Sequence, residues 1–237
     1  MQQSNFDNFS NDWWKDDGPL KLLHSMNETR ILFIQERILN RYQNFKSLET
    51  IFSKKSVLDL GCGGGILSES LARKGAKVTA CDTSSKLIKV AKKRAFSQNL
   101  DINYKVGDIQ LLKKKSLKFD IIISLEVIEH VSNYKAFLAG LHSCLNKEGI
   151  IILSTINRNF LSYFSTILVA EKLLNLVPRG THDWNKYIKP EEIINFYEEY
   201  NLKLDKKVGL LPLPLIKNFK WVRISNTSSN YILSIVN

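Results

Sequence analysis

The chain has 237 residues and a formal net charge of +11 at pH 7, from 34 lysines and arginines against 23 acids. This length suits one α/β domain with additions, because a single core can grow to that size without splitting. The charge predicts anionic partners, and nucleic acid or an acidic membrane surface would each satisfy it. Three cysteines without paired spacing argue against a disulfide scaffold and favour a reducing, cytoplasmic setting.

The first 55 residues are expected to form a helical lid segment ahead of the main domain, which spans 56–237. Trp13 and Trp14 stand before the first strand, where they would either cover a hydrophobic ligand or pack on the core. Arg30 precedes an apolar helical stretch and is a candidate partner for a carboxylate such as that of methionine.

The most informative stretch is residues 56–65, where a short apolar strand runs into a glycine-rich turn and then a helix. Glycines allow a ligand to approach the backbone closely, and a helix N-terminus supplies free N–H groups. Asp59, Gly61 and Gly63 fit the spacing D-x-G-x-G-x-G, whereas the dinucleotide fingerprint would need a small residue at Ile66. These three residues are therefore candidate cofactor contacts, with a glycine turn that binds nothing as the alternative.

Two further acids follow predicted strands. The strand over 77–82 ends at Asp82, whose carboxylate is placed to accept hydrogen bonds from both hydroxyls of a ribose, although an ordinary strand-end acid would look the same. The strand over 102–106 ends near Asp108, a candidate acceptor for an adenine amino group, and a simple turn acid explains it equally well.

Strand, glycine turn, helix and terminal acid together resemble the class I S-adenosylmethionine-dependent methyltransferases. The resemblance implies a Rossmann-like α/β fold with helices on both faces of a mostly parallel, seven-stranded sheet. Two C-terminal runs, 202–215 and 231–236, are expected to close that sheet as an antiparallel strand pair.

The fourth predicted strand, Phe119–Leu125, is apolar throughout and leads into a cluster of Glu126, Glu129 and His130. O-methylation of a phenol requires loss of the phenolic proton. His130 with Glu129 beside it could remove that proton as a general base, or Glu126, Glu129 and His130 could bind a divalent ion that promotes its loss. Magnesium, manganese and zinc all stay open as the metal, and so does a cluster with one base and no metal.

Residues 156–188 are longer than a minimal strand-to-helix connection and are expected to form an insertion that serves the substrate. Charges interrupt its apolar part, 160–177, so a membrane-spanning helix is not expected. The stretch is predicted to lie on an anionic membrane, with packing onto the sheet as the alternative.

Several weak motifs combine into a resemblance to the ubiquinone-biosynthesis O-methyltransferase family. They include Trp13-Trp14, Leu23-His24, Gly61 to Gly65, Glu126 to Val131, Pro178 to Asp183 and Asn230-Tyr231. The resemblance implies S-adenosylmethionine as cofactor and a polyprenylated hydroxyphenol or demethylubiquinol as substrate. Four positions contact the cofactor in that family, and here they are Arg30, Gly61, Asp82 and Leu125. The acidic motif is associated with a divalent metal in some members.

The implied location is the inner face of the bacterial membrane, where other enzymes of quinone biosynthesis are further candidate partners. The rival interpretation is a methyltransferase acting on RNA or on another small hydroxylated substrate. The chain lacks an N-P-P-Y type sequence, and the insertion is apolar where an RNA site would interleave basic and aromatic residues, so nucleic acid is not expected. The intact glycine turn and Glu/Glu/His cluster argue against a third interpretation, a cofactor-binding scaffold without catalysis.

Overall fold

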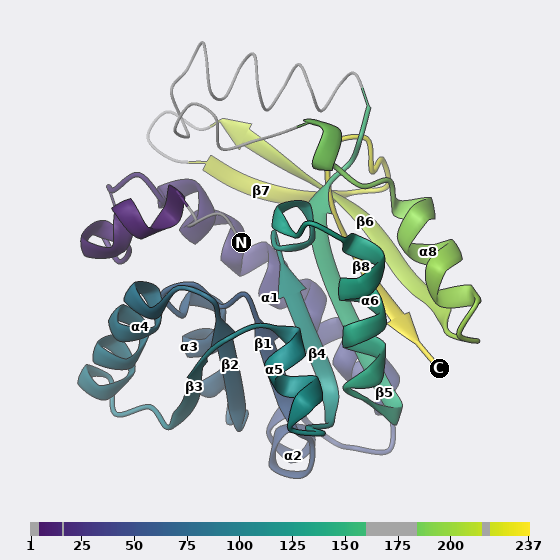
Figure 1. The fold of residues 1–237 in the computed structure, drawn as a ribbon, viewed down its shortest axis with the longest axis horizontal. Helices are drawn as coiled ribbons and strands as arrows, with labels where there is room; N and C mark the ends of the chain where they lie inside the picture. The colour runs from purple at the N-terminus through teal and green to yellow at the C-terminus, as the bar shows by residue number, and fades with distance from the viewer. Residues whose placement is uncertain (1–4, 16, 160–183, 215–218) are drawn as a thin grey trace.

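The computed structural model describes residues 5–15, 17–159, 184–214 and 219–237, which fold around one sheet with helices on both faces (Figure 1). The strands are β1 (Val57–Leu60), β2 (Val78–Asp82), β3 (Ile102–Val106), β4 (Phe119–Leu125), β5 (Leu145–Ile156), β6 (Lys203–Pro214), β7 (Phe219–Ile224) and β8 (Asn230–Val236). The α-helices are α1 (Lys21–Arg41), α2 (Leu48–Lys54), α3 (Ile66–Ala72), α4 (Ser85–Ser97), α5 (Ile109–Lys114), α6 (Tyr134–Ser143) and α8 (Pro190–Glu198). Short 3-10 helices are η1 (Asn5–Asp12), η2 (Ile128–His130) and η4 (Trp184–Lys186).

The strand order is β3-β2-β1-β4-β5-β8-β6-β7. Neighbours from β3 to β5 pair in parallel, whereas β8 pairs antiparallel with both β5 and β6. β1 lies between β2 and β4, so the order of the strands reverses at this point. In open α/β sheets, ligands bind outside the carboxyl ends of the strands at such a switch point, which here is the edge formed by the ends of β1, β2 and β4.

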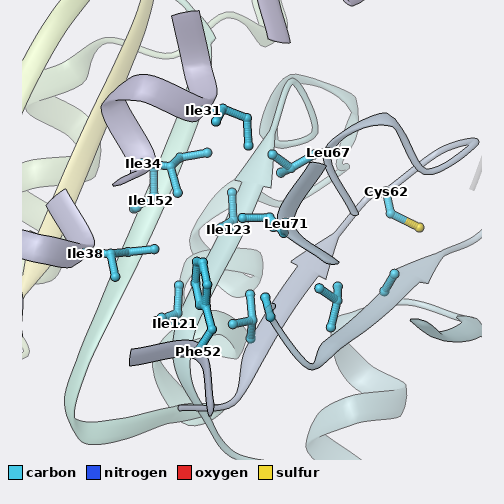
Figure 2. Packing of buried hydrophobic residues seen from close by; sticks show 14 of the residues in the cluster. Ile31, Ile34, Ile38, Phe52, Cys62, Leu67, Leu71, Ile121, Ile123 and Ile152 are labelled. Carbon is cyan, nitrogen blue, oxygen red and sulfur yellow. The ribbon is translucent and has the colours of Figure 1, made fainter. Parts of the chain in front are cut away.

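Each face of the sheet carries its own core because successive residues of a strand point to opposite sides. Ile34 and Ile38 of α1, fully buried, pack with residues of α2 and α3 over one face of the sheet, as Figure 2 shows. Ile121 and Ile123 of β4 supply the strand side of this cluster, while Ile122 points into the opposite core under α5, α6 and α8. Helix α1 therefore belongs to the core of the domain, although it lies within the segment expected to form a lid.

Side-chain caps or a proline stand at the starts of three helices. Ser84 caps α4 by accepting a hydrogen bond from the Leu87 N–H at 3.1 Å, and Asn133 caps α6 in the same manner. Pro190 occupies the first turn of α8, where its fixed φ suits a helix and its missing N–H is not needed.

The expected number of seven strands is wrong, because the described residues already form a sheet of eight. Strand β6 and strand β8 form the expected antiparallel pair, but β7 adds an edge strand that pairs antiparallel with β6. Its central Trp221 is buried against α1, where its Nε1 donates to the Ser25 hydroxyl at 3.0 Å and its carbonyl accepts from Thr29 at 2.9 Å. These contacts with a distant helix stabilise β7, and the mixed basic and apolar sequence of the strand does not reveal them.

Candidate active site

The turns after β1 and β4 meet at Gly61. This glycine has φ +78°, and a Cβ placed on it would lie 2.1 Å from Cγ2 of Val127, so no other residue fits without displacing the second turn. The N–H groups of Gly61 and Cys62 donate to the Cys81 carbonyl at 2.7 and 3.2 Å. These two donors therefore hold the turn together.

Asp82 ends β2 directly beside this turn. One carboxylate oxygen accepts from the Gly63 N–H at 2.9 Å and the other from the Ser84 N–H at 2.8 Å. Each oxygen retains lone-pair capacity for a further donor, as a ribose with two hydroxyls would require. Burial raises the pKa of Asp82 above its ordinary value, with the nearby Asp7 carboxylate adding to the effect.

Asp59 lies under the turn instead of facing a ligand. Its side chain is 2% exposed and accepts a hydrogen bond from the Ser68 hydroxyl of α3. Burial raises the pKa of Asp59 to about 7. A contact between Asp59 and the cofactor stays a prediction, whereas its bond to Ser68 joins β1 to the helix that follows the turn.

Asp108 caps α5, since its Oδ1 accepts from the N–H groups of Gln110 and Leu111 at 3.0 and 3.2 Å. This is the turn-acid alternative that the sequence left open. The cap uses one carboxylate oxygen, so a contact to adenine through the other stays a prediction.

Glu126 follows Leu125, the last residue of β4, and adopts φ +54°, a conformation that a residue with a Cβ seldom takes outside functional or strained sites. Its Oε1 accepts from Arg30 Nη2 of α1 at 2.7 Å and from the Ser154 hydroxyl of β5 at 2.7 Å. Arg30 is 3% exposed and the Glu126 side chain 21%, so the arginine end of this ion pair is shielded from water. The carboxylate that Arg30 meets in the structure is therefore that of Glu126, and within the described part of the chain its buried Nε has no hydrogen-bond partner.

Glu129 is buried in the short helix η2 and accepts a hydrogen bond from the Thr155 hydroxyl of β5 at 2.8 Å. Burial raises the pKa of Glu129 well above its ordinary value, and the negative charge of Glu126 adds to the effect. Glu129 thus anchors the turn after β4 to the neighbouring strand.

His130 is the exposed member of the cluster. Its backbone N–H donates to the Val127 carbonyl at 2.9 Å, and its ring meets the ring of Phe6 edge to face, with centroids 6.0 Å apart and planes at 82°. An exposed imidazole beside the switch point can exchange a proton with a substrate, which the buried Glu129 is poorly placed to do.

The three residues proposed as metal ligands do not fit that role as arranged. Glu126 already accepts hydrogen bonds from Arg30 and Ser154, and the buried Glu129 accepts one from Thr155. In the part of the chain that the structure describes, no group of three His, Cys, Asp or Glu side chains is placed to hold a metal ion.

The N-terminal segment, residues 5–14, covers the glycine turn. The buried ring of Trp13 lies so close that a Cβ on Gly63 would be 2.5 Å from it. Trp14 donates through Nε1 to the Gly64 carbonyl at 3.1 Å, and the Arg94 guanidinium lies 4.3 Å from the centre of its ring. The two tryptophans pack directly on the candidate binding turn, whereas a role in covering a ligand stays a prediction.

Several supporting residues received no role from the sequence, although Ser154 and Thr155 begin a stretch, 154–159, that contributes to the family resemblance. Ser154 and Thr155 hold the two glutamates but lie in a buried apolar strand, and Phe6 and Asp7 precede every recognisable motif. Hydroxyl side chains at the carboxyl end of β5 were the signal that could have identified Ser154 and Thr155.

The stretch predicted to lie on a membrane, 160–177, is outside the described residues. Among the described residues, no helix is long and apolar enough to span a membrane.

Comparison with known proteins shows extensive similarity. A family model described as a methyltransferase domain matches residues 26–207. The chain is 38% identical over 231 residues to the ubiquinone biosynthesis O-methyltransferase of Pelagibacter ubique strain HTCC1062, an alignment that covers 98% of this chain and 95% of the relative. It is 39% identical over 227 residues to the enzyme of the same description from Coxiella burnetii strain RSA 331 / Henzerling II, covering 96% and 91%.

Among solved structures, the chain is similar to a magnesium protoporphyrin IX methyltransferase from Synechocystis PCC 6803 with bound SAH. The TM-score is 0.64 at 20% sequence identity, with 98% of this chain and 96% of the other covered. At this identity, the likeness bears on the fold alone.

The free energy of unfolding should depend on pH through the carboxyl group of Asp59, and Asp59→Asn should remove that dependence. Between about pH 4 and pH 7 the unfolded chain has lost a proton that folded Asp59 keeps, because burial raises its pKa to about 7. The free energy of unfolding should therefore fall as the pH rises through this window, by up to about 1.4 kcal/mol per pH unit from this residue. Urea unfolding of both proteins without cofactor measures this, and a difference that stays constant with pH would contradict it.

Proposed function

Because this chain belongs to the ubiquinone biosynthesis O-methyltransferase family, we propose that it methylates a phenolic oxygen of polyprenylated hydroxyphenol and demethylubiquinol intermediates. The predicted family, fold class and S-adenosylmethionine dependence are confirmed, and methylation of RNA is not favoured. The observation that carries the proposal is that the exposed His130 and the Asp82 carboxylate stand at the same sheet edge, on either side of the glycine turn.

The cofactor is assigned to the carboxyl-end edge of the sheet at the glycine turn, between Gly61 and Asp82. Asp82 would accept the two ribose hydroxyls, since both of its oxygens are already held in place by backbone N–H groups. The buried Nε of Arg30 would donate to the methionine carboxylate, and Leu125 would line the site at the end of β4. The bound cofactor supplies an electrophilic methyl group.

His130 is assigned as the general base that takes the phenolic proton, so that a phenolate attacks the methyl group. Glu126 and Glu129 hold the turn that carries His130, the first through Arg30 and Ser154 and the second through Thr155. No step is assigned to a metal ion, because both glutamates are already engaged by these partners.

The substrate class also supports a peripheral location of the protein on the inner, cytoplasmic face of the membrane. A polyprenyl tail resides in lipid, and drawing it into water costs about 0.8 kcal/mol per methylene, so an enzyme at the interface avoids that cost. The net charge of +11 would attract anionic head groups, and the exposed Leu211 and Leu213, two positions apart on β6, add apolar surface. Residues 160–177 are the proposed docking stretch, and other quinone-biosynthesis enzymes are candidate partners there.

Replacing Asp82 with alanine should weaken cofactor binding by about 1–3 kcal/mol, because two hydrogen bonds to a neutral ribose are lost. Isothermal titration calorimetry with S-adenosylmethionine measures the change. The matched control is Asp101→Ala, which removes an exposed acid just before β3 and should leave the affinity as it is. Wild-type affinity in the Asp82 variant would exclude this residue from the site.

Replacing His130 with alanine should lower kcat by roughly 10²–10⁴-fold, the usual contribution of a general base, while the affinity for S-adenosylmethionine changes little. His142→Ala provides a control, since His142 lies on α6 against Tyr200, away from the sheet edge. Methyl transfer to a short-chain demethylubiquinol analogue, followed by mass spectrometry, gives the rates.

The same assay distinguishes proton removal by His130 alone from proton removal that needs a metal ion. With His130 acting alone, activity should survive exhaustive chelation. Loss of activity on chelation that added Mg²⁺, Mn²⁺ or Zn²⁺ restores would overturn the assignment of proton removal without a metal.

The protein should float with vesicles that contain anionic lipid and much less with neutral vesicles, because charge and apolar surface act together at the interface. Deletion of 160–177 should abolish flotation while cofactor binding, measured by calorimetry, confirms that the variant is folded. If the intact protein does not bind anionic vesicles at low salt, the proposed membrane docking is wrong, and residues 160–177 serve the substrate only.

A further inference from the structure

Phe6 lies between the proposed base and the cover of the glycine turn. Its ring meets His130 with centroids 6.0 Å apart and planes at 82°, and it meets Trp13 at 6.4 Å and 68°. Both are edge-to-face arrangements, which aromatic pairs prefer and which fix the relative orientation of the rings. The imidazole is thus connected through two ring contacts to the residue that packs on Gly63.

The segment that carries Phe6 is fastened at the cofactor half of the site. Asp7 accepts a hydrogen bond from the Ser84 hydroxyl, and the backbone N–H of Ser84 donates to Asp82. Trp13 and Trp14 fix the other end of the segment on Gly63 and Gly64. Helix η1 accordingly lies beside α4 (Figure 1), and Phe6 is held from both sides.

His130 belongs to a three-residue turn and is exposed. An exposed side chain samples several rotamers, and a general base must lie within hydrogen-bond reach of the proton that it removes. A ring held edge to face restricts the rotamers that the imidazole can adopt. Phe6 stands 124 positions before His130 in the sequence, so a distant part of the chain supplies this contact.

We propose that Phe6 is a positioning residue that holds the imidazole of His130 toward the phenolic hydroxyl of the substrate. The proposal rests on the function assigned to His130 above. It gives Phe6 a part in the chemical step, separate from the packing of Trp13 and Trp14 on the glycine turn, and that part depends on an aromatic ring at position 6.

The test compares Phe6→Leu with Phe6→Tyr. Loss of the ring should lower kcat about 3- to 10-fold, which corresponds to about 0.6–1.4 kcal/mol, while the KM for S-adenosylmethionine and its affinity by calorimetry stay unchanged. Phe6→Tyr keeps the ring and should retain nearly the wild-type kcat. A Phe6→Leu variant with unchanged kcat, or one that weakens cofactor binding instead, overturns the proposal.

Phe9→Leu controls for loosening of η1. Phe9 lies on the same short helix and, like Phe6, packs against the buried cluster of Trp13, Leu20, Ile66 and Leu87. A merely structural effect should therefore appear in this variant as well. The proposal expects kcat within about twofold of wild type here, and an equal loss in the Phe6 and Phe9 variants overturns it.

The His130→Ala background separates this proposal from the function on which it rests. Adding Phe6→Leu to His130→Ala should cause no further loss, because the ring acts through the imidazole, and a further loss overturns the proposal. If His130→Ala alone leaves kcat unchanged, the assigned base is wrong and the proposal falls with it. If His130→Ala abolishes turnover while Phe6→Leu does not change it, the base stands and only the role of Phe6 is overturned.

Discussion

The site depends on one close approach, between Gly61 after β1 and Val127 after β4. A Cβ at Gly61 would lie 2.1 Å from the valine side chain, so the two turns fit together only with glycine at this position. β1 and β4 are neighbours at the point where the strand order reverses. The contact therefore fixes the distance between the cofactor half of the site and the half that carries His130.

Acidic groups are concentrated at this edge of a strongly basic protein. Burial raises the pKa values of Asp59, Asp82 and Glu129, since a carboxylate loses hydration inside the protein. A ligand that brings positive charge offsets this cost, whereas a neutral one does not. Asp59 and Glu129 thus lie inside the protein, while the net charge of +11 acts on partners at the outer surface.

The two glutamates of the cluster have different partners in the fold. Glu126, in a left-handed conformation, pairs with Arg30 from α1, and Glu129 is held by Thr155 from β5. Breaking a buried ion pair is costly because one charge is left uncompensated. Both contacts therefore stabilise the turn, and His130 is left as the exposed titratable group at its end.

The sequence by itself determined the parallel strands up to β4, the glycine turn and Asp82 at the end of β2, because each follows from local periodicity or turn chemistry. It did not determine β7, which is held by α1, or the partner of Glu126, which lies 96 positions away. Local patterns specify where a strand or helix begins and which face is apolar. Which side chains then meet is decided by strand order and by the packing of helices on the sheet, and these bring together residues that no spacing in the sequence relates.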